Sequence, residues 1–358
     1  MTIDTRIDIV VGTYSRLDGE GLIPLSYHRA SDAWIIGDAV GDIVDASHGA
    51  YLSRLGCHYF VEEAEDGRVS CHSGPQDHWR RIATRGTAGA APCHCALDPD
   101  GNRLAVANYG SGTVALYRLD PVNGTPVGEP ATYGLAGRGP DAERQTQAHA
   151  HWVGFAADGR TLYCVDLGSD RIWAFAVGDA DTPLPPPSIA YRAPAGSGPR
   201  HLAFHPTRPV AFLVSELAST LTMLMIGSDG ALEPRVTAST VPEGVSGSLG
   251  GAVATNRAGD RVYVTNRGHD SVAVFGIEDD ALVLLQHVGT RGKSPRFILL
   301  MDDEARLLVA NEEGGGVSIF AVRPDGTLSP CPHTLDVNGA VFLAEMPSSI
   351  ARPSAWPS

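Results

Sequence analysis

The sequence predicts an all-β fold, a seven-bladed β-propeller of four-stranded antiparallel blades. Five segments, which begin at His94, His151, His201, Ala252 and Phe297, share three apolar runs separated by two short turns. This pattern is typical of three antiparallel strands. Equivalent residues at positions 14, 63, 109, 167, 216, 267 and 312 lie 49, 46, 58, 49, 51 and 45 residues apart. Such a period indicates a propeller or a solenoid, and seven equivalents indicate seven blades.

The repeat accounts for both ends of the chain. Residues 7–27 match only the second and third strands, and residues 50–74 match all three strands in degraded form. The run at 338–346 resembles the first strand that the first copy lacks. We therefore expect this C-terminal strand to close the ring, which would hide exposed strand edges. One propeller domain over residues 1–346 and a Pro- and Ser-rich tail over 347–358 are predicted.

Composition and charge argue against several classes of partner. The 358 residues carry a formal net charge of −14, whereas binding to nucleic acid needs a basic surface. The chain has no run of 18 apolar residues, so we expect no membrane span. The opening segment MTIDTRIDIVVGTYS has no apolar signal core, and we expect a cytoplasmic protein. The oligomeric state is left open.

Strand direction predicts where a site can form. The first strand of each blade is innermost and lines the central channel. In an antiparallel blade, the start of this strand and the turn between the second and third strands lie at the same end. Residues at these two positions in different blades should therefore meet around one channel mouth. We expect that mouth to be solvated.

These two positions hold mostly polar or charged residues. A purely structural repeat would favour an apolar residue at the strand start and Gly, Asn or Asp at the turn. The starts of the first strands align Cys93, His151, Arg200, Gly251 and Arg296. The second residue after each middle strand aligns Tyr14, Glu63, Tyr109, Leu167, Glu216, Arg267 and Glu312. Guanidinium groups bind anions, and a histidine beside them suits acid–base chemistry. The alternative is a polar channel mouth that carries no chemistry.

An insertion at 137–152 explains the longest repeat interval and should lie on the same face. It contains Arg144 and His149. His149 and His151 lie two residues apart, so in extended chain they would point the same way. The spacing supplies no third metal ligand for this pair, and the run Cys93-His94-Cys95 lacks a second Cys or His pair. We therefore expect no metal.

The insertion also carries a resemblance to a known family. The pattern GxGPxxERQxxxHxH, formed by Gly137, Gly139, Pro140, Glu143, Arg144, Gln145, His149 and His151, resembles the seven-bladed propeller lactonases. So do VDLGSDRI at 165–172, GPRHLAFHP at 198–206, SEL at 215–217 and YVTNRGHDSVAVF at 263–275. The family comprises propeller-type 6-phosphogluconolactonases and 3-carboxy-cis,cis-muconate lactonizing enzymes. The resemblance implies an enzyme of small anionic lactones that needs no organic cofactor and has a His, Arg, Glu and Arg active-site set.

The sequence thus predicts a hydrolase of a sugar-acid lactone, most similar to 6-phosphogluconolactonase. The predicted catalytic residues are His151 as general base, Arg200 and Arg267 as anion and oxyanion ligands, and Glu216, which would orient an arginine or pass a proton. The predicted substrate-binding residues are Arg144, His149, Arg296, Tyr109, Glu63 and Glu312. The alternatives are a carboxymuconate cycloisomerase that uses the same cluster and a non-catalytic interaction ring.

Overall fold

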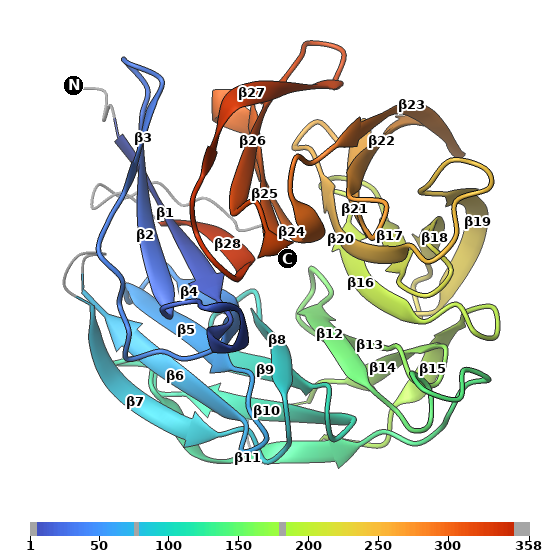
Figure 1. The fold of residues 1–358 in the computed structure, drawn as a ribbon. Coiled ribbons are helices and arrows are strands. Elements are labelled where there is room, and N and C mark those ends of the chain that lie inside the picture. The colour runs from blue at the N-terminus through green and yellow to red at the C-terminus, as the bar shows by residue number, and fades with distance from the viewer. Residues whose placement is uncertain (1–5, 75–78, 179–183, 347–358) are drawn as a thin grey trace.

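The computed structural model describes residues 6–74, 79–178 and 184–346, which form seven four-stranded antiparallel sheets in a ring (Figure 1). The predicted all-β, seven-bladed architecture is therefore confirmed. The proposed tail at 347–358 lies outside the described residues.

The blades follow one another along the chain, each with its innermost strand first except in the closing blade. The closing blade contains β28 (Ala340–Met346), β1 (Arg6–Thr13), β2 (Leu22–His28) and β3 (Ala33–Ile36). The second and third blades contain β4 (Ala46–Leu52), β5 (Cys57–Glu62), β6 (Arg68–Ser73) and β7 (Arg80–Gly86), then β8 (Pro92–Leu97), β9 (Arg103–Asn108), β10 (Thr113–Leu119) and β11 (Pro126–Gly134).

The remaining blades repeat this order. The fourth contains β12 (Ala150–Phe155), β13 (Thr161–Asp166), β14 (Arg171–Ala176) and β15 (Ser188–Arg192), and the fifth β16 (Pro199–Phe204), β17 (Val210–Ser215), β18 (Thr220–Ile226) and β19 (Leu232–Ser239). The sixth contains β20 (Leu249–Thr255), β21 (Arg261–Arg267), β22 (Ser271–Glu278) and β23 (Ala281–Gly289), and the seventh β24 (Lys293–Met301), β25 (Arg306–Gly314), β26 (Val317–Val322) and β27 (Leu328–Leu335). Two 3-10 turns, η1 (Ser15–Leu17) and η3 (Asp302–Glu304), follow β1 and β24.

The C-terminal strand closes the ring as predicted. β28 pairs with β1 in antiparallel register, with Gly12 opposite Phe342 and Val10 opposite Ala344. This strand takes the innermost place that the first strand of each repeat takes elsewhere. The N- and C-terminal parts of the chain therefore share one blade, as the blue and red strands of Figure 1 show.

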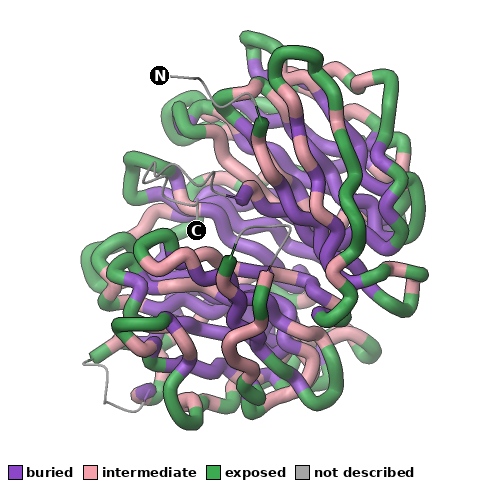
Figure 2. Tube along the Cα trace, turned by 90° about the vertical axis from the view of Figure 1, so that its left-hand side faces the viewer, coloured by how far each residue is buried: buried purple, intermediate pink, exposed green. Residues whose placement is uncertain are grey.

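The core consists of apolar layers between neighbouring blades. Each of seven buried clusters joins side chains of two adjacent sheets. Val106 of the third blade, for example, packs with Tyr59 of the second. Figure 2 shows these buried segments running along the strands, whereas exposed segments gather at the loops. The strands therefore hold a rigid frame, and the loops at one end of the ring carry the site.

Candidate active site

β-Bulges present the polar side chains at one end of the channel. The inner strands β4, β8, β12 and β16 skip one residue in their pairing with the next strand, and the skipped residues are Ser47, Cys93, His151 and Arg200. β24 skips Arg296 in the same way. A bulge leaves its extra residue unpaired and turns the side chain out of the regular alternation. The aligned strand-start residues are therefore bulge residues aimed at one channel mouth.

Glu216 is the centre of the site. Its Oε2 lies 3.0 Å from Nε of Arg200 and 2.6 Å from Nη2 of Arg267, and its Oε1 lies 2.5 Å from Nη2 of Arg144. The Arg144 guanidinium also donates to the hydroxyl of Tyr109, 3.3 Å away. Three guanidinium groups from three parts of the chain therefore converge on one carboxylate, and the insertion lies on the predicted face.

Burial and charge give this cluster its ionisation states. Burial alone would raise the pKa of Glu216, but Arg267, Arg200 and the other positive neighbours outweigh it and hold that pKa well below its usual range. Burial, together with Arg267 and Arg296, lowers the pKa of Arg200 to about 9. Arg200 therefore remains charged at neutral pH, and Glu216 remains an anion. Glu216 is suited to orienting arginines and not to donating a proton.

His151 lies beside this cluster. Its Nδ1 is 3.9 Å from Sγ of Cys93, and its ring meets those of Tyr109 and His201 edge to face at centroid distances of 5.4 and 5.2 Å. Burial and, next, the charge of Arg200 lower the pKa of His151 well below its ordinary value. The imidazole is therefore neutral at pH 7 and able to accept a proton.

A second group of charges continues the site around the mouth. The Tyr14 hydroxyl donates to Oε2 of Glu63 at 2.6 Å, and the Arg296 guanidinium lies 5.2 Å from the centroid of the Tyr14 ring. Nη1 of Arg296 is 3.3 Å from Oε2 of Glu312, which also pairs with Arg16. Here two arginines face two carboxylates, so the excess of positive charge lies on the Glu216 side.

The depth of these side chains corrects one expectation. The sequence predicted a solvated mouth, but Arg200 and Glu216 are each 1% exposed and His151 is 5% exposed. The side chains of Arg144, Arg296 and Arg267 reach solvent, at 35%, 14% and 12%. The site thus has a buried floor and an arginine rim. The bulges contribute to this burial at His151 and Arg200, which they turn inward, whereas Glu216 directly follows β17.

Histidine and aromatic rings fill the channel below the floor. The rings of His48 and His94 stack at 3.7 Å, and His94 meets His201 at 5.6 Å. His48 also contacts Phe297 and Phe342, at 5.9 and 5.0 Å, although their strands belong to other blades. Residues one step beyond the bulges therefore pack across the channel axis beneath the site.

The insertion histidine does not share the position of His151. His149 precedes β12, and its ring stacks on Tyr109 at 4.5 Å while its Nδ1 lies 2.9 Å from the Tyr109 carbonyl oxygen. Tyr109 thus contacts both histidines, and the bulge removes the simple alternation that the sequence suggested. Among the described residues no group of three His, Cys, Asp or Glu side chains is arranged to hold a metal. Metal independence stays a prediction.

The second aligned position, which the sequence placed two residues after each middle strand, is also corrected by one residue. It is the first residue after the middle strand at Tyr14, Glu63, Tyr109, Leu167 and Glu216, and it lies within a strand at Arg267 and Glu312. Leu167 is fully buried and apolar. The structure brings all ten predicted site residues, which are His151, Arg200, Glu216, Arg267, Arg144, His149, Arg296, Tyr109, Glu63 and Glu312, into the two connected groups described above.

Four residues of the site were not among those predicted to act. Tyr14 had the right repeat position, so its alignment with Tyr109 was the available signal. Cys93 and His201 adjoin His151 and Arg200, with Nη1 of Arg200 3.2 Å from Nε2 of His201. Arg16 belongs to η1, outside the repeat. No repeat position exists for such a residue, and only the structure locates it.

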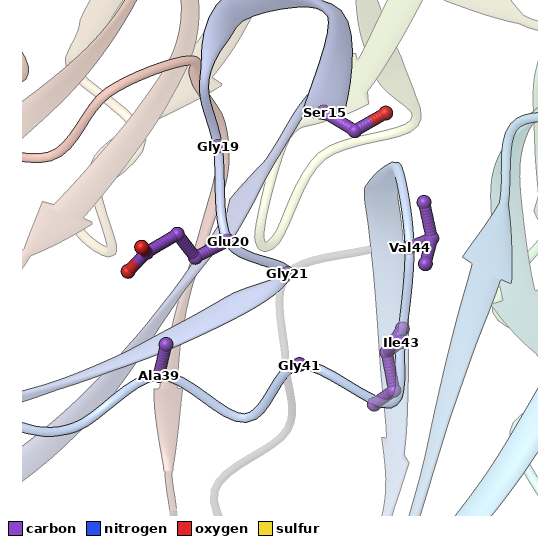
Figure 3. Close-up of a pocket in the computed structure, with 8 residues that line it drawn as sticks. All are labelled: Ser15, Gly19, Glu20, Gly21, Ala39, Gly41, Ile43 and Val44. Carbon is purple, nitrogen blue, oxygen red and sulfur yellow. The ribbon is translucent and has the colours of Figure 1, made fainter.

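A shallow hollow of about 380 Å³ lies beside η1, between the β1–β2 turn and the segment that leads into β4 (Figure 3). Glycines form much of its wall, and Glu20 is the one charged residue among those that line it. It contains none of the arginines or histidines of the site. We therefore do not assign it to the substrate.

The comparisons with known proteins agree with this geometry. A family model described as "Lactonase, 7-bladed beta-propeller" matches residues 8–344. The chain belongs to this lactonase family. A 6-phosphogluconolactonase from Bacillus subtilis (strain 168) is 32% identical to this chain over 256 residues, 70% of this chain and 71% of the relative.

Solved structures share the whole fold of this chain. A protein from Lactobacillus plantarum superposes with a TM-score of 0.88 at 26% identity, over 96% of this chain and 100% of that one. A periplasmic gluconolactonase from Pseudomonas aeruginosa has a TM-score of 0.87 at 23% identity, over 96% and 99% of the two chains. In the described part of this chain, no helix is long and apolar enough to cross a membrane.

Proposed function

We propose that this lactonase hydrolyses a sugar-acid lactone that carries an anionic group, with 6-phosphogluconolactone as the first candidate. The observation that carries the proposal is the set of three guanidinium groups around the single carboxylate of Glu216. In a chain of net charge −14, this local excess of positive charge favours a phosphate or carboxylate ligand. The similarity to a 6-phosphogluconolactonase supports the same substrate.

The proposed reaction uses the floor and the rim for different tasks. The rim arginines Arg144 and Arg267 bind the anionic group, because their side chains reach solvent. Water attacks the lactone carbonyl carbon, and neutral His151 takes its proton. Arg200 stabilises the oxyanion of the tetrahedral intermediate. The ring C–O bond then breaks, and the leaving alkoxide takes the proton back from His151 to give the open hydroxy acid.

The role of Glu216 follows from its ionisation. The surrounding arginines keep the carboxylate deprotonated, so it has no proton to give the alkoxide near neutral pH. We propose that Glu216 orients Arg144, Arg200 and Arg267 towards the substrate. The alternative carboxymuconate cycloisomerase activity would need the donation of a proton to carbon, for which the deprotonated Glu216 is unsuited by the same argument. His151 is the candidate for that transfer.

A substrate panel tests the proposal. The purified protein is mixed with 6-phosphogluconolactone, unphosphorylated gluconolactone or carboxymuconate, and each rate is compared with the spontaneous reaction. We expect the highest kcat/KM for the phosphorylated lactone. Turnover of carboxymuconate alone would indicate a cycloisomerase, and no rate above the spontaneous one in any arm would favour an interaction ring.

A cytoplasmic location stays a prediction, since a periplasmic gluconolactonase shares the fold.

A further inference from the structure

One buried aspartate outside the reacting groups connects the two loops that deliver Arg144 and Arg200. Asp170 lies in the turn between β13 and β14 and is 6% exposed. Its Oδ1 accepts hydrogen bonds from the backbone N–H of Gly198 and from Nε2 of Gln145, both at 2.8 Å. Its Oδ2 accepts one from the N–H of Gly196 at 2.7 Å. These bonds reach other segments of the chain and not only the turn that contains Asp170.

Both connected segments end at the site. Gln145 directly follows Arg144, and Gly198 comes two residues before the bulge residue Arg200. Gln145 is fully buried, and its Nε2 also donates to the Leu167 carbonyl oxygen at 2.8 Å. Arg144 and Arg200 then meet on the two oxygens of Glu216. A displacement of the Asp170 carboxylate would therefore move two guanidinium groups at once.

The same arrangement recurs before Arg296, a bulge residue of the rim whose side chain is 14% exposed. Asp270 occupies the equivalent turn of the sixth blade, and its Oδ1 accepts from the N–H of Ser294 at 2.9 Å. Ser294 comes two residues before the bulge residue Arg296. Asp170 and Asp270 have left-handed backbones, with φ of 54° and 53°, which aspartate tolerates better than most residues.

The blade between them provides a contrast. Its equivalent turn residue is Ser219, whose hydroxyl donates to the Ser248 carbonyl oxygen at 2.8 Å. That loop leads to Gly251, which has no side chain to place. Within these three blades, the turn carboxylate occurs where the next bulge residue is an arginine.

We propose that Asp170 is a positioning residue, which holds Arg144 in the geometry that binds the anionic group of the substrate and Arg200 in the geometry that stabilises the oxyanion. The inference rests on the proposed function, because it concerns the same site. Asp170 touches no reacting atom and acts through the Gln145 and Gly198 segments. A displacement of about 1 Å at a binding group is enough to lower an enzymatic rate about 10²-fold.

The variant Asp170→Asn tests this role. Asparagine keeps the size of the side chain and also tolerates the left-handed backbone, but its amide nitrogen cannot accept a hydrogen bond from an N–H group. We expect kcat/KM for 6-phosphogluconolactone to fall about 10–100-fold, with a higher KM because Arg144 is displaced and a lower kcat because Arg200 is displaced. The fall for unphosphorylated gluconolactone should be smaller, because that substrate lacks the anionic group.

Asp98→Asn is the matched control. Asp98 is also a buried turn aspartate and accepts two backbone N–H bonds, from Asn102 at 2.7 Å and Arg103 at 2.8 Å. Its turn joins the first and second strands of the third blade, at the opposite end of the ring. Asp98→Asn should lower stability without changing the ratio of the two kcat/KM values. Equal effects of the two variants on that ratio would overturn the proposal.

A double-mutant cycle and a binding measurement complete the test. In an Arg200→Ala background, Asp170→Asn should cost much less than in the wild type, because one of its two arginines is already absent. Additive losses would contradict the proposal. If the wild type opened no lactone, the proposed function would fail, and calorimetric titration with 6-phosphogluconate would still decide the positioning role. A weaker affinity in Asp170→Asn supports it, and an unchanged affinity overturns it.

Discussion

Glu216 shows how burial and charge assign roles to individual residues. A buried carboxyl group alone would hold its proton, but the arginines around Glu216 reverse that tendency. Its negative charge in turn allows three guanidinium groups to lie close together, since each repels the others. With Glu216 fixed as an anion, proton transfer in the proposed reaction falls to a histidine.

His151→Ala should separate catalysis from binding. We expect kcat to fall about 10²–10⁴-fold with little change in KM, because the general base is lost while the arginines remain. His205→Ala is a matched control: His205 is also buried, but it lies in a turn of the fifth blade, where its Nδ1 accepts backbone N–H bonds from Thr207 and Arg208. Steady-state kinetics on 6-phosphogluconolactone provide the measurement. Near-wild-type turnover in His151→Ala would make His149 the next candidate.

The pH dependence of kcat/KM gives a second test of His151. Burial and Arg200 lower the pKa of this imidazole, so it stays neutral as pH falls through 6.5. An ordinary histidine base would be about three-quarters protonated at pH 6 and would lose activity about fourfold. We expect an almost flat profile between pH 8 and pH 6 with unphosphorylated gluconolactone, whose lack of a phosphate removes the substrate's own titration. A fourfold loss centred on pH 6.5 would exclude His151 as the base.

At the scale of the elements, the sequence predicts at which end of the channel the bulge residues lie. It does not predict the bulges themselves or the burial of their side chains. Repeat alignment places Cys93, His151, Arg200 and Arg296 at one end of the channel because strand direction alone decides the end. Alternation fails at the same residues, because an extra unpaired residue leaves no mark on the apolar pattern. The burial of the floor was therefore not predictable, whereas the end of the ring that carries the site was.

The closing strand is the element whose role the sequence predicts most directly, and Phe342→Ala tests its contribution to stability. Phe342 is 2% exposed, packs with Val10 and Phe60, and meets the Phe297 ring at 5.1 Å. We expect a loss of about 3–5 kcal/mol in the free energy of unfolding, measured by urea titration. Val122→Ala, at an 81% exposed position, should change it by less than about 0.5 kcal/mol. A similarly small effect of Phe342→Ala would contradict the closure of the ring by β28.

The whole molecule combines an acidic exterior with a core that holds neutral histidines. Burial lowers the pKa of His48 and His58 to about 3 and that of His72 to about 4. Burial likewise lowers the pKa of His94, His151 and His201. Each folded-state pKa lies below the unfolded value of about 6.5. The unfolded chain therefore binds more protons once the pH falls below that value.

This difference predicts acid sensitivity of the fold. Stability is fully present above pH 6.5 and decreases below it, by up to about 1.4 kcal/mol per pH unit for each such histidine. Glu345 acts in the opposite direction, because burial raises its pKa to about 7, but it is one group against six. Urea unfolding at pH 7.5, 6.5 and 5.5 should show a loss of several kcal/mol, most of it over the last step. Constant stability from pH 7.5 to 5.5 would show that these histidines protonate in the folded protein.

The central claim is that one mouth of the ring binds an anionic sugar acid through the arginines that Glu216 holds. A crystal structure with bound 6-phosphogluconate, the product of the proposed reaction, tests it most directly. We predict the phosphate within hydrogen-bond distance of Arg144 or Arg267 and the carboxylate, which derives from the lactone carbonyl, beside Arg200 and His151. Product bound at the opposite mouth, or with its phosphate away from all three arginines, would contradict the claim.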